Sequence, residues 1–383
     1  MGPQPGLGLP YGDDVSAKEE PRAGLSAARR IVVKIGSRAI VAGPGGHGRF
    51  QQLADESAAL MARGCRVALV SSGAVAMGRE RLGLNQRPDT TPMLQATAAV
   101  GQARLVQAYE RAFMRHDIPV AQVLLTHAGL VDRARYLNAR HAIDALFEIG
   151  AVPVINENDT VSTEEIEFGD NDQLAAMVAS LVGADLLVLL TDVDGLLDEK
   201  QRRVPLVEDV GRVHSLIWEQ PQDMSLGGMG SKVGAAERAL ARGLPVVIAP
   251  ASDPRALQRI VDGEDVGTLF LPRGAKLASR KYWIAYTLRP RGTLRVDAGA
   301  ARAIVDGKRS LLAAGITAVE GDFRPGDAVR ICDSAGLELA RGLSRYEARE
   351  VGLLLGVRSD EIEERLGRHG GDEIVHRDDL VVL

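Results

Sequence analysis

The chain has 383 residues, which is more than one hydrophobic core usually organises, and this length favours a large domain followed by a smaller one. Apolar residues make up 45% of the chain and no apolar run is long enough to cross a bilayer, so a membrane protein is excluded. The net charge of −5 argues against a chain whose main task is to hold nucleic acid. Cys65 and Cys332 form neither a disulfide framework nor a metal-ligand cluster, which fits a reducing cytoplasm.

The first 28 residues mix proline, glycine and charged residues without a regular apolar period. They also lack the apolar centre of a signal peptide. We therefore expect residues 1–28 to be a disordered leader.

From residue 29 to about 285, the chain alternates short apolar runs with longer amphipathic stretches. Such apolar runs, bounded by Gly, Asp, Asn or Ser, are typical of buried parallel strands, and the stretches between them suit crossover helices. The expected strands are 31–33, 67–70, 120–124, 152–155, 186–190 and 246–248, and the expected helices are 50–63, 93–115, 132–148, 171–182 and 231–242. The pattern predicts an α/β fold, a three-layer α/β/α sandwich around a mainly parallel open sheet.

The pattern changes in the segment 286–383, where short β-type runs are separated by Gly, Pro and Asp turns. This predicts a small, mostly β domain at the C-terminal end. Residues 288–383 contain 15 basic and 17 acidic side chains, so this domain is nearly neutral.

Polar residues gather where the predicted strands of the first domain end. The carboxyl edge of a parallel sheet collects loops and helix N-termini, whose free N–H groups favour phosphate. The motifs at this edge are Lys34 to Ser37, Ser71 to Ala74, Asn156 to Asp159 with Gly169 to Gln173, Thr191-Asp192, and the glycine-rich loop Gly227 to Lys232.

Each of these motifs has an ordinary structural explanation when it is taken alone. A lysine after a strand is usually a solvated surface residue. Asp170 and Asp172 are suited to cap a helix, Asp192 to shape a turn, and Ser72 to cap a second helix. Five such coincidences at successive strand ends are improbable, so the motifs together favour a functional site.

A competing signal lies at residues 43–48, GPGGHG, which satisfy the G-x-G-x-x-G pattern between a strand and a helix. That pattern would make the protein a dehydrogenase. However, residues 65–78 contain no Asp or Glu to bind the ribose of a dinucleotide. The sequence also lacks the G-x-x-x-x-G-K-[ST] loop, so a kinase would need another way to hold phosphate.

Over about 350 residues the sequence closely resembles the glutamate 5-kinases of the amino acid kinase family, with a tail that resembles their PUA domain. The similarity lies in VVKIGS, VSSGAVAMGRE, the long segment containing INEND and GDND, LLTDVDGL and GGMGSK. It implies transfer of the ATP γ-phosphoryl group to the γ-carboxylate of glutamate, the first step of proline synthesis, with Mg²⁺ required.

The resemblance also implies a role for each matching residue. Lys34 and Lys232 would neutralise the transferred phosphoryl group, Asp172 would orient the lysines, and Asp170 would help to hold substrate. The implied glutamate-binding residues are Ser72, Gly73, Asp159 and Asn171. The implied ATP-binding residues are Lys34, Thr191, Asp192, Gly227, Gly228, Met229, Gly230, Ser231 and Lys232. No protein ligand for the metal is implied.

Two segments depart from the family pattern. Leu226 replaces a hydroxyl residue before the glycine-rich loop, and residues 126–133 are less polar than usual. The first departure affects a side-chain contact with ATP, and the second affects details on the substrate side.

The resemblance further implies inhibition by proline, a homotetramer or homodimer, and coupling to glutamate-5-semialdehyde dehydrogenase. PUA domains are otherwise associated with RNA, but the near-neutral charge of this one favours a regulatory or protein-binding role. We expect a kinase truncated before residue 285 to remain folded and active.

The proposed chemistry agrees with which residues the motifs contain. A carboxylate nucleophile is already ionised at neutral pH, and none of the seven histidines lies among the strand-end motifs to act as a base. Kinases of acetylglutamate, aspartate, carbamate or nucleoside monophosphates would share the sheet and both lysines. The choice of glutamate therefore depends on INEND, GDND and the PUA-like tail.

Overall fold

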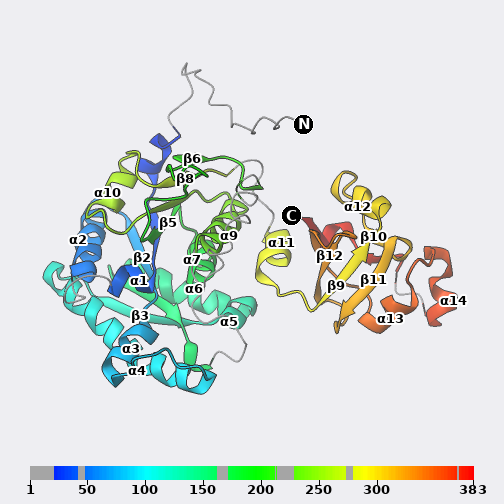
Figure 1. The fold of residues 1–383 in the computed structure, drawn as a ribbon, viewed down its shortest axis with the longest axis horizontal. Helices are drawn as coiled ribbons and strands as arrows, with labels where there is room; N and C mark the ends of the chain where they lie inside the picture. Colours follow the sequence, from blue (N-terminus) through cyan, green and yellow to red (C-terminus); the bar gives the residue numbers. More distant parts are fainter. Residues whose placement is uncertain are drawn as a thin grey trace, which may run out of the picture.

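The computed structural model describes residues 21–41, 48–161, 171–211, 213, 228–272, 279–368 and 371–383. These residues form an α/β domain with a large sheet and a smaller C-terminal β domain (Figure 1). The predicted fold class is confirmed. The G-x-G-x-x-G pattern at residues 43–48 lies outside the described residues except for Gly48, which begins a helix.

The large sheet has eight strands in the order β3-β4-β2-β1-β5-β7-β8-β6. All neighbouring strands are parallel except β7 and β8, which are antiparallel. The strands are β1 (Arg30–Ile35), β2 (Arg66–Ser71), β3 (Val120–Leu125), β4 (Val152–Glu157), β5 (Leu186–Thr191), β6 (Leu206–Val207), β7 (Val246–Pro250) and β8 (Thr268–Phe270). The six predicted strands are all present, whereas the sequence pattern missed β6 and β8, which are only two and three residues long.

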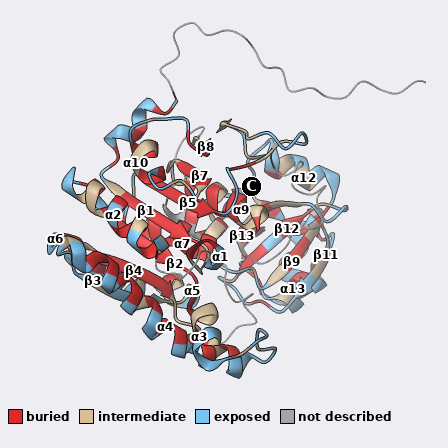
Figure 2. Cartoon of the chain, turned by 60° about the vertical axis from the view of Figure 1, so that its left-hand side comes forward, coloured by how far each residue is buried: buried red, intermediate tan, exposed pale blue. Residues whose placement is uncertain are grey.

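Helices cover both faces of this sheet, because successive side chains of a strand point to opposite sides. In β1, Ile31 and Val33 belong to one apolar core, while Val32 belongs to the other. The first core also includes side chains of α2 (Gly48–Ala62), α4 (Thr91–Phe113) and α10 (Ala256–Val261), and the second includes those of α6 (Arg133–Glu148), α7 (Asn171–Leu181) and α9 (Met229–Leu240). Figure 2 shows the strands as the buried centre between partly exposed helices.

Three further helices lie near strand ends: α1 (Ser37–Val41), α3 (Ala74–Leu82) and α5 (His127–Val131). Helix α3 packs against α4 so closely that the backbones touch at two glycines. A Cβ atom on Gly78 would lie 1.9 Å from the carbonyl oxygen of Thr97, and one on Gly101 would lie 1.7 Å from that of Ala74. Only glycine permits this contact, so these two positions fix α3 against α4.

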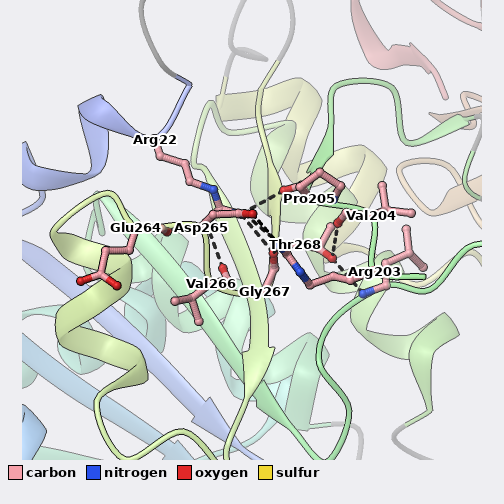
Figure 3. A network of polar contacts seen from close by, with 10 residues as sticks. Arg22, Arg203, Val204, Pro205, Glu264, Asp265, Val266, Gly267 and Thr268 are labelled. Atoms are coloured by element: carbon pink, nitrogen blue, oxygen red, sulfur yellow. Dashed lines mark hydrogen bonds and ion pairs between the residues drawn. The ribbon is translucent and has the colours of Figure 1, made fainter. Parts of the chain in front are cut away.

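Residues 21–28, which the sequence assigns to the leader, are part of the first domain. They include the 3₁₀ turn η1 (Ala23–Ala27), and the side chain of Arg22 is buried. Its guanidinium donates hydrogen bonds to the carbonyl oxygens of Pro205, Glu264, Val266 and Gly267 at 2.9–3.2 Å (Figure 3). Residues 21–28 are therefore not part of a disordered leader, because one arginine satisfies four carbonyl groups near the start of β8.

The C-terminal domain has its own apolar core and two small sheets. The larger sheet has the order β11-β9-β12-β13-β15, and β10 pairs with β14. The strands of this domain are β9 (Gly292–Val296), β10 (Leu311–Leu312), β11 (Ile316–Gly321), β12 (Ala328–Cys332), β13 (Glu338–Leu343), β14 (Glu373–Val375) and β15 (Leu380–Val382). The helices of the domain are α12 (Ala298–Val305), α13 (Ala348–Leu353) and α14 (Ile362–Leu366).

A short helical connection, α11 (Ser279–Tyr282) followed by the π-helical turn η5 (Trp283–Thr287), joins the two domains. Arg238 of α9 donates a 2.5 Å hydrogen bond to the carbonyl oxygen of Tyr286. Arg341 of β13 donates one of the same length to the carbonyl oxygen of Ala285. The connection is thus bonded to both domains through consecutive backbone carbonyls.

Candidate active site

The predicted site residues that the structure describes come together at the carboxyl edge of the large sheet. Strands β1, β2, β4 and β5 are close neighbours in the sheet, so their carboxyl ends lie side by side. Helices α3, α7 and α9 begin near this edge, and the first turn of a helix offers unpaired N–H groups and a partial positive charge. The edge is therefore suited to bind anions.

Two lysines and one aspartate form the centre of this edge. Lys34 of β1 lies 2.5 Å from one carboxylate oxygen of Asp172, and Lys232 of α9 lies 3.2 Å from the other. The contact between Lys34 and Asp172 is an ion pair. Ser231 donates a hydrogen bond of 3.1 Å to the same oxygen as Lys232. The three charged side chains are at most 5% exposed, so little water screens them.

Asp172 lies between the two ammonium groups and offsets the repulsion between them. Burial lowers the pKa of Lys232, Asp172 raises it again, and Lys34 contributes a smaller lowering. One carboxylate and two ammonium groups leave one net positive charge in a buried position. Such a cluster is stabilised when an anion such as a phosphoryl group arrives.

A chain of buried polar side chains continues from Asp172 along the sheet edge. Asn171 donates to the hydroxyl oxygen of Ser72 at 2.8 Å and to the side-chain oxygen of Asn156 at 3.0 Å. Asn156 in turn donates to Gln102 at 2.8 Å. The side-chain oxygen of Asn171 is buried and has no hydrogen-bond partner among the described residues, so it is available to accept a bond from a ligand.

Beside this chain lies a cavity of about 210 Å³. Its size suits a small metabolite, because sites for drug-sized ligands are usually larger, at roughly 300–1,000 Å³. The cavity carries side chains of both charges, and its lining consists of Ser37, Ser72, Gly73, Ala74, Val75, Ala76, Arg79, Arg87, Asn156, Glu157, Asp159 and Asn171.

Comparison with known proteins agrees with this geometry. Residues 29–250 match the amino acid kinase family, and residues 292–366 match the PUA domain. The glutamate 5-kinases of Myxococcus xanthus and Trichlorobacter lovleyi are 49% and 47% identical to this chain, each over 94% of it and 98% of the relative. The chain belongs to the amino acid kinase family, among the glutamate 5-kinases. The enzyme of that name from Methylococcus capsulatus is 46% identical over 95% of this chain and the whole of the relative.

Asp159, an acid that lines the cavity of this kinase, has an altered pKa. Burial raises the pKa of Asp159 to about 6, and the positive charge of Arg87 offsets part of this rise. Near pH 7 the group is therefore mostly ionised, but it titrates within the range of an ordinary assay.

Gly73, the residue before α3, has a φ of +116°, a conformation that residues with a Cβ rarely adopt. An added Cβ would also lie 3.2 Å from a methyl group of Ile40. This glycine lets the chain turn from β2 into α3, and it keeps the start of α3 open to the cavity.

Thr191 and Asp192 lie at the carboxyl end of β5, on the other side of β1 from the cavity. Thr191 donates to Asp192 at 3.1 Å, and Arg38 lies 3.6 Å from the same carboxylate. Partial burial opposes ionisation of Asp192, but the bonds to its own backbone N–H and to Thr191, together with Arg38 and Lys232, lower its pKa. Thr191 and Asp192 therefore form a small polar group at the end of β5, on the side of the lysine cluster away from the cavity.

The glycine-rich loop is described from Gly228 onward, and Met229 to Lys232 form the first turn of α9. Asp170, Leu226 and Gly227 lie outside the described residues, so their implied roles stay predictions. Within the described ranges no group of three His, Cys, Asp or Glu side chains is placed to hold a metal ion, and no helix is long and apolar enough to span a membrane.

Sequence reasoning assigned no role to several residues of the site. Arg79 follows directly after the SSGAVAMG run, and Arg87 lies in the polar loop after α3, but neither is at a strand end. Gln102 is in the middle of α4, where an apolar pattern hides it. The sequence offered one indication of a role for Arg79, which is its position directly after the glycine that ends the SSGAVAMG run.

Proposed function

We propose that this enzyme transfers the γ-phosphoryl group of ATP to the γ-carboxylate of L-glutamate and forms γ-glutamyl 5-phosphate. The observation that supports this most strongly is the buried Lys34–Asp172–Lys232 cluster beside a cavity with charges of both signs. The names of the relatives support the choice of substrate.

In this proposal the two lysines offset the negative charge of the phosphoryl group as it moves between donor and acceptor. Asp172 is bonded to both lysines and holds them at the same position before the substrates arrive. Such preorganised charge is usually the largest contribution to phosphoryl transfer. The glutamate carboxylate is ionised at neutral pH, so the enzyme needs no general base.

We propose that Mg²⁺ accompanies ATP. Both oxygens of Asp172 already contact ammonium groups, and the described residues offer no carboxylate cluster. Mg²⁺ readily keeps several waters and binds phosphate oxygens, so this donor set fits a metal held mainly by ATP and water. When bound, it would add further positive charge next to the phosphates.

Proline is proposed as an inhibitor that occupies the glutamate cavity. It carries the same α-amino and α-carboxylate groups but lacks a γ-carboxylate, so its complex would be a dead end. Excess glutamate should then relieve the inhibition. This regulation would suit the first step of proline synthesis.

The division into a kinase domain at 29–285 and a PUA domain at 286–383, cytoplasmic location, a homotetramer or homodimer, and coupling to glutamate-5-semialdehyde dehydrogenase are also proposals. For the PUA domain we propose a regulatory or protein-binding role, because its charges are nearly balanced. Tight, salt-dependent binding of RNA by the full chain would overturn that assignment.

The direct test is an assay with ATP, Mg²⁺ and a panel of carboxylic acids, in which hydroxylamine traps the acyl phosphate. The panel should include glutamate, N-acetylglutamate, aspartate and carbamate. We expect a hydroxamate from glutamate at a rate far above the others. Faster reaction with another acid would reject glutamate as the substrate while leaving the lysine cluster in place.

A further inference from the structure

Arg79 is a cationic residue of the cavity to which the proposed mechanism gives no task. It lies in α3, directly after Gly78, and its side chain lines the cavity together with Arg87 and Asp159. One terminal nitrogen donates to the carbonyl oxygen of Asn85 at 2.7 Å. The Nε atom is buried and has no hydrogen-bond partner among the described residues.

A buried guanidinium donor without a partner is costly, because the group has lost water and gained nothing in return. The two cationic side chains of the cavity differ in this respect. The charge of Arg87 acts on Asp159, an acid of the same cavity. Arg79 is bonded to a neutral carbonyl, so it is the one suited to receive a carboxylate from a ligand.

The cavity offers anion sites at two different places along α3. Its N-terminal turn, Gly73 to Ala76, forms one part of the wall, and Arg79 forms another. With a rise of about 1.5 Å per residue, the Cα atoms of Ala74 and Arg79 are separated by roughly 7.5 Å along the axis. One terminal nitrogen of Arg79 is bonded beyond the helix, to Asn85, and the side chain lines the same cavity as the first site. Two anionic groups on one small ligand can therefore be held at once.

The same cavity also offers groups of the opposite character. The carboxylate of Asp159 and the free side-chain oxygen of Asn171 both line the cavity and can accept bonds from an ammonium group. The cavity thus combines two anion sites with one cation site. An amino dicarboxylic acid has this pattern of charges.

The position of the lysine cluster determines which carboxylate of the ligand binds at the start of α3 and which binds at Arg79. Ser72, which precedes Gly73 and α3, accepts a hydrogen bond from Asn171, the neighbour of Asp172 in the chain. The reacting carboxylate must lie at this end, near Lys34 and Lys232. We propose that Arg79 binds the α-carboxylate of glutamate and thereby determines specificity for an α-amino acid. This inference rests on the proposed function.

The test compares Arg79→Gln with Arg81→Gln, a matched control on the same helix whose side chain is exposed. Loss of a charge-assisted bond should raise the KM for glutamate roughly 10- to 100-fold. The KM for ATP should change less than about twofold, and Arg81→Gln should resemble the wild type. Arg79→Lys should fall between, because an ammonium restores the charge without the planar fork.

Two analogues separate recognition from a general structural effect. 4-Aminobutyrate is glutamate without the α-carboxylate, and glutarate is glutamate without the ammonium group. We measure each as an inhibitor of glutamate phosphorylation. Arg79→Gln should weaken glutarate as much as glutamate but leave 4-aminobutyrate nearly unchanged. A merely structural role would weaken all three alike.

Every outcome bears on the proposal. If the wild type fails to phosphorylate glutamate, the proposed function is wrong, and this failure is visible before any variant is made. If glutamate is the substrate but Arg79→Gln keeps its KM, or loses all three compounds equally, the role of Arg79 is wrong. Thermal unfolding of each variant shows whether it is folded. If Arg79→Gln does not fold, Arg79→Lys supplies the same comparison.

Discussion

The lysine cluster and the cavity beside it are both polar and close together, yet they differ in how their groups are satisfied. In the cluster, the charges of Lys34 and Lys232 are balanced in part by one aspartate between them. In the cavity, Arg79 and Asn171 each keep a buried atom without a hydrogen-bond partner among the described residues, and burial raises the pKa of Asp159.

The two regions therefore have different functions. The cluster must hold its geometry before substrate arrives, because catalysis by fixed charge depends on preorganisation. The cavity instead keeps bonding capacity that a ligand can use, and it is less stable without one. Substitutions in the cluster should therefore affect turnover, whereas substitutions in the cavity should affect glutamate binding.

The largest effect is expected from Lys34→Ala and Lys232→Ala. Each removes a positive charge that acts on the phosphoryl group in the transition state, so kcat should fall by about 10²-fold or more. Arginine should rescue neither well, because a planar fork does not replace a point charge. Steady-state kinetics measures kcat for each variant, and Lys200→Ala, a change at an exposed lysine, is the control. Near-normal turnover in either alanine variant would contradict its assigned role.

A smaller effect, confined to glutamate, is expected from Asp159→Asn. Because Asp159 must be ionised to bind the ammonium group, wild-type kcat/KM for glutamate should fall as pH drops below about 6. The asparagine variant should show a glutamate KM raised roughly tenfold at pH 8, and it should lack this inflection. An unchanged pH profile in the variant would show that another group titrates.

The same substitution should not reduce stability at pH 8. The pKa of Asp159 is raised in the folded state, so its contribution to stability is present at low pH and is lost as pH rises from about 4 through 6. Removing the carboxylate should therefore leave the Tm at pH 8 equal or higher. Weaker glutamate binding without a loss of stability in Asp159→Asn would show that this carboxylate serves ligand binding rather than folding.

Gly78→Ala tests whether the cavity depends on the contact between α3 and α4. The added Cβ would lie 1.9 Å from the carbonyl oxygen of Thr97, so the helices must separate. We expect a stability loss of about 1–3 kcal/mol and a glutamate KM raised a few fold as Arg79 moves. Gly48→Ala is the control, because nothing lies within 4 Å of its added Cβ. Equal effects on the KM values for ATP and glutamate would mean that the whole edge is disturbed.

The smallest effect on activity is expected at Glu56, a buried acid of α2 away from both regions. It accepts a 2.6 Å hydrogen bond from the backbone nitrogen of Leu257, and burial raises its pKa to about 7. Its contribution to stability should be present at low pH and be lost as pH rises from about 4.5 through 7. Glu56→Gln should flatten this part of the Tm profile while kcat stays unchanged. A profile that keeps the wild-type slope would assign the titration to another group.

The sequence predicted those parts of the molecule that depend on local patterns. Buried parallel strands consist of short apolar runs, so β1 to β5 and β7 were recognised, and the strand-end rule led to Lys34, Ser72, Asn171 and Asp172. The second lysine followed from its glycine-rich loop. The remainder depended on contacts between distant residues: Arg79 lines the cavity from α3, and two glycines bring this helix onto α4. Likewise, no local pattern shows that Arg22 reaches carbonyls more than 180 residues away.

The bonded connection between the domains also makes them mechanically linked. Arg238 and Arg341 hold the carbonyls of neighbouring residues in η5, one from the kinase domain and the other from the C-terminal domain. Arg238 is on α9, and the first turn of this same helix carries Lys232. A helix is stiff along its axis, so a force that tilts the C-terminal domain acts on one end of a lever whose other end is a catalytic lysine.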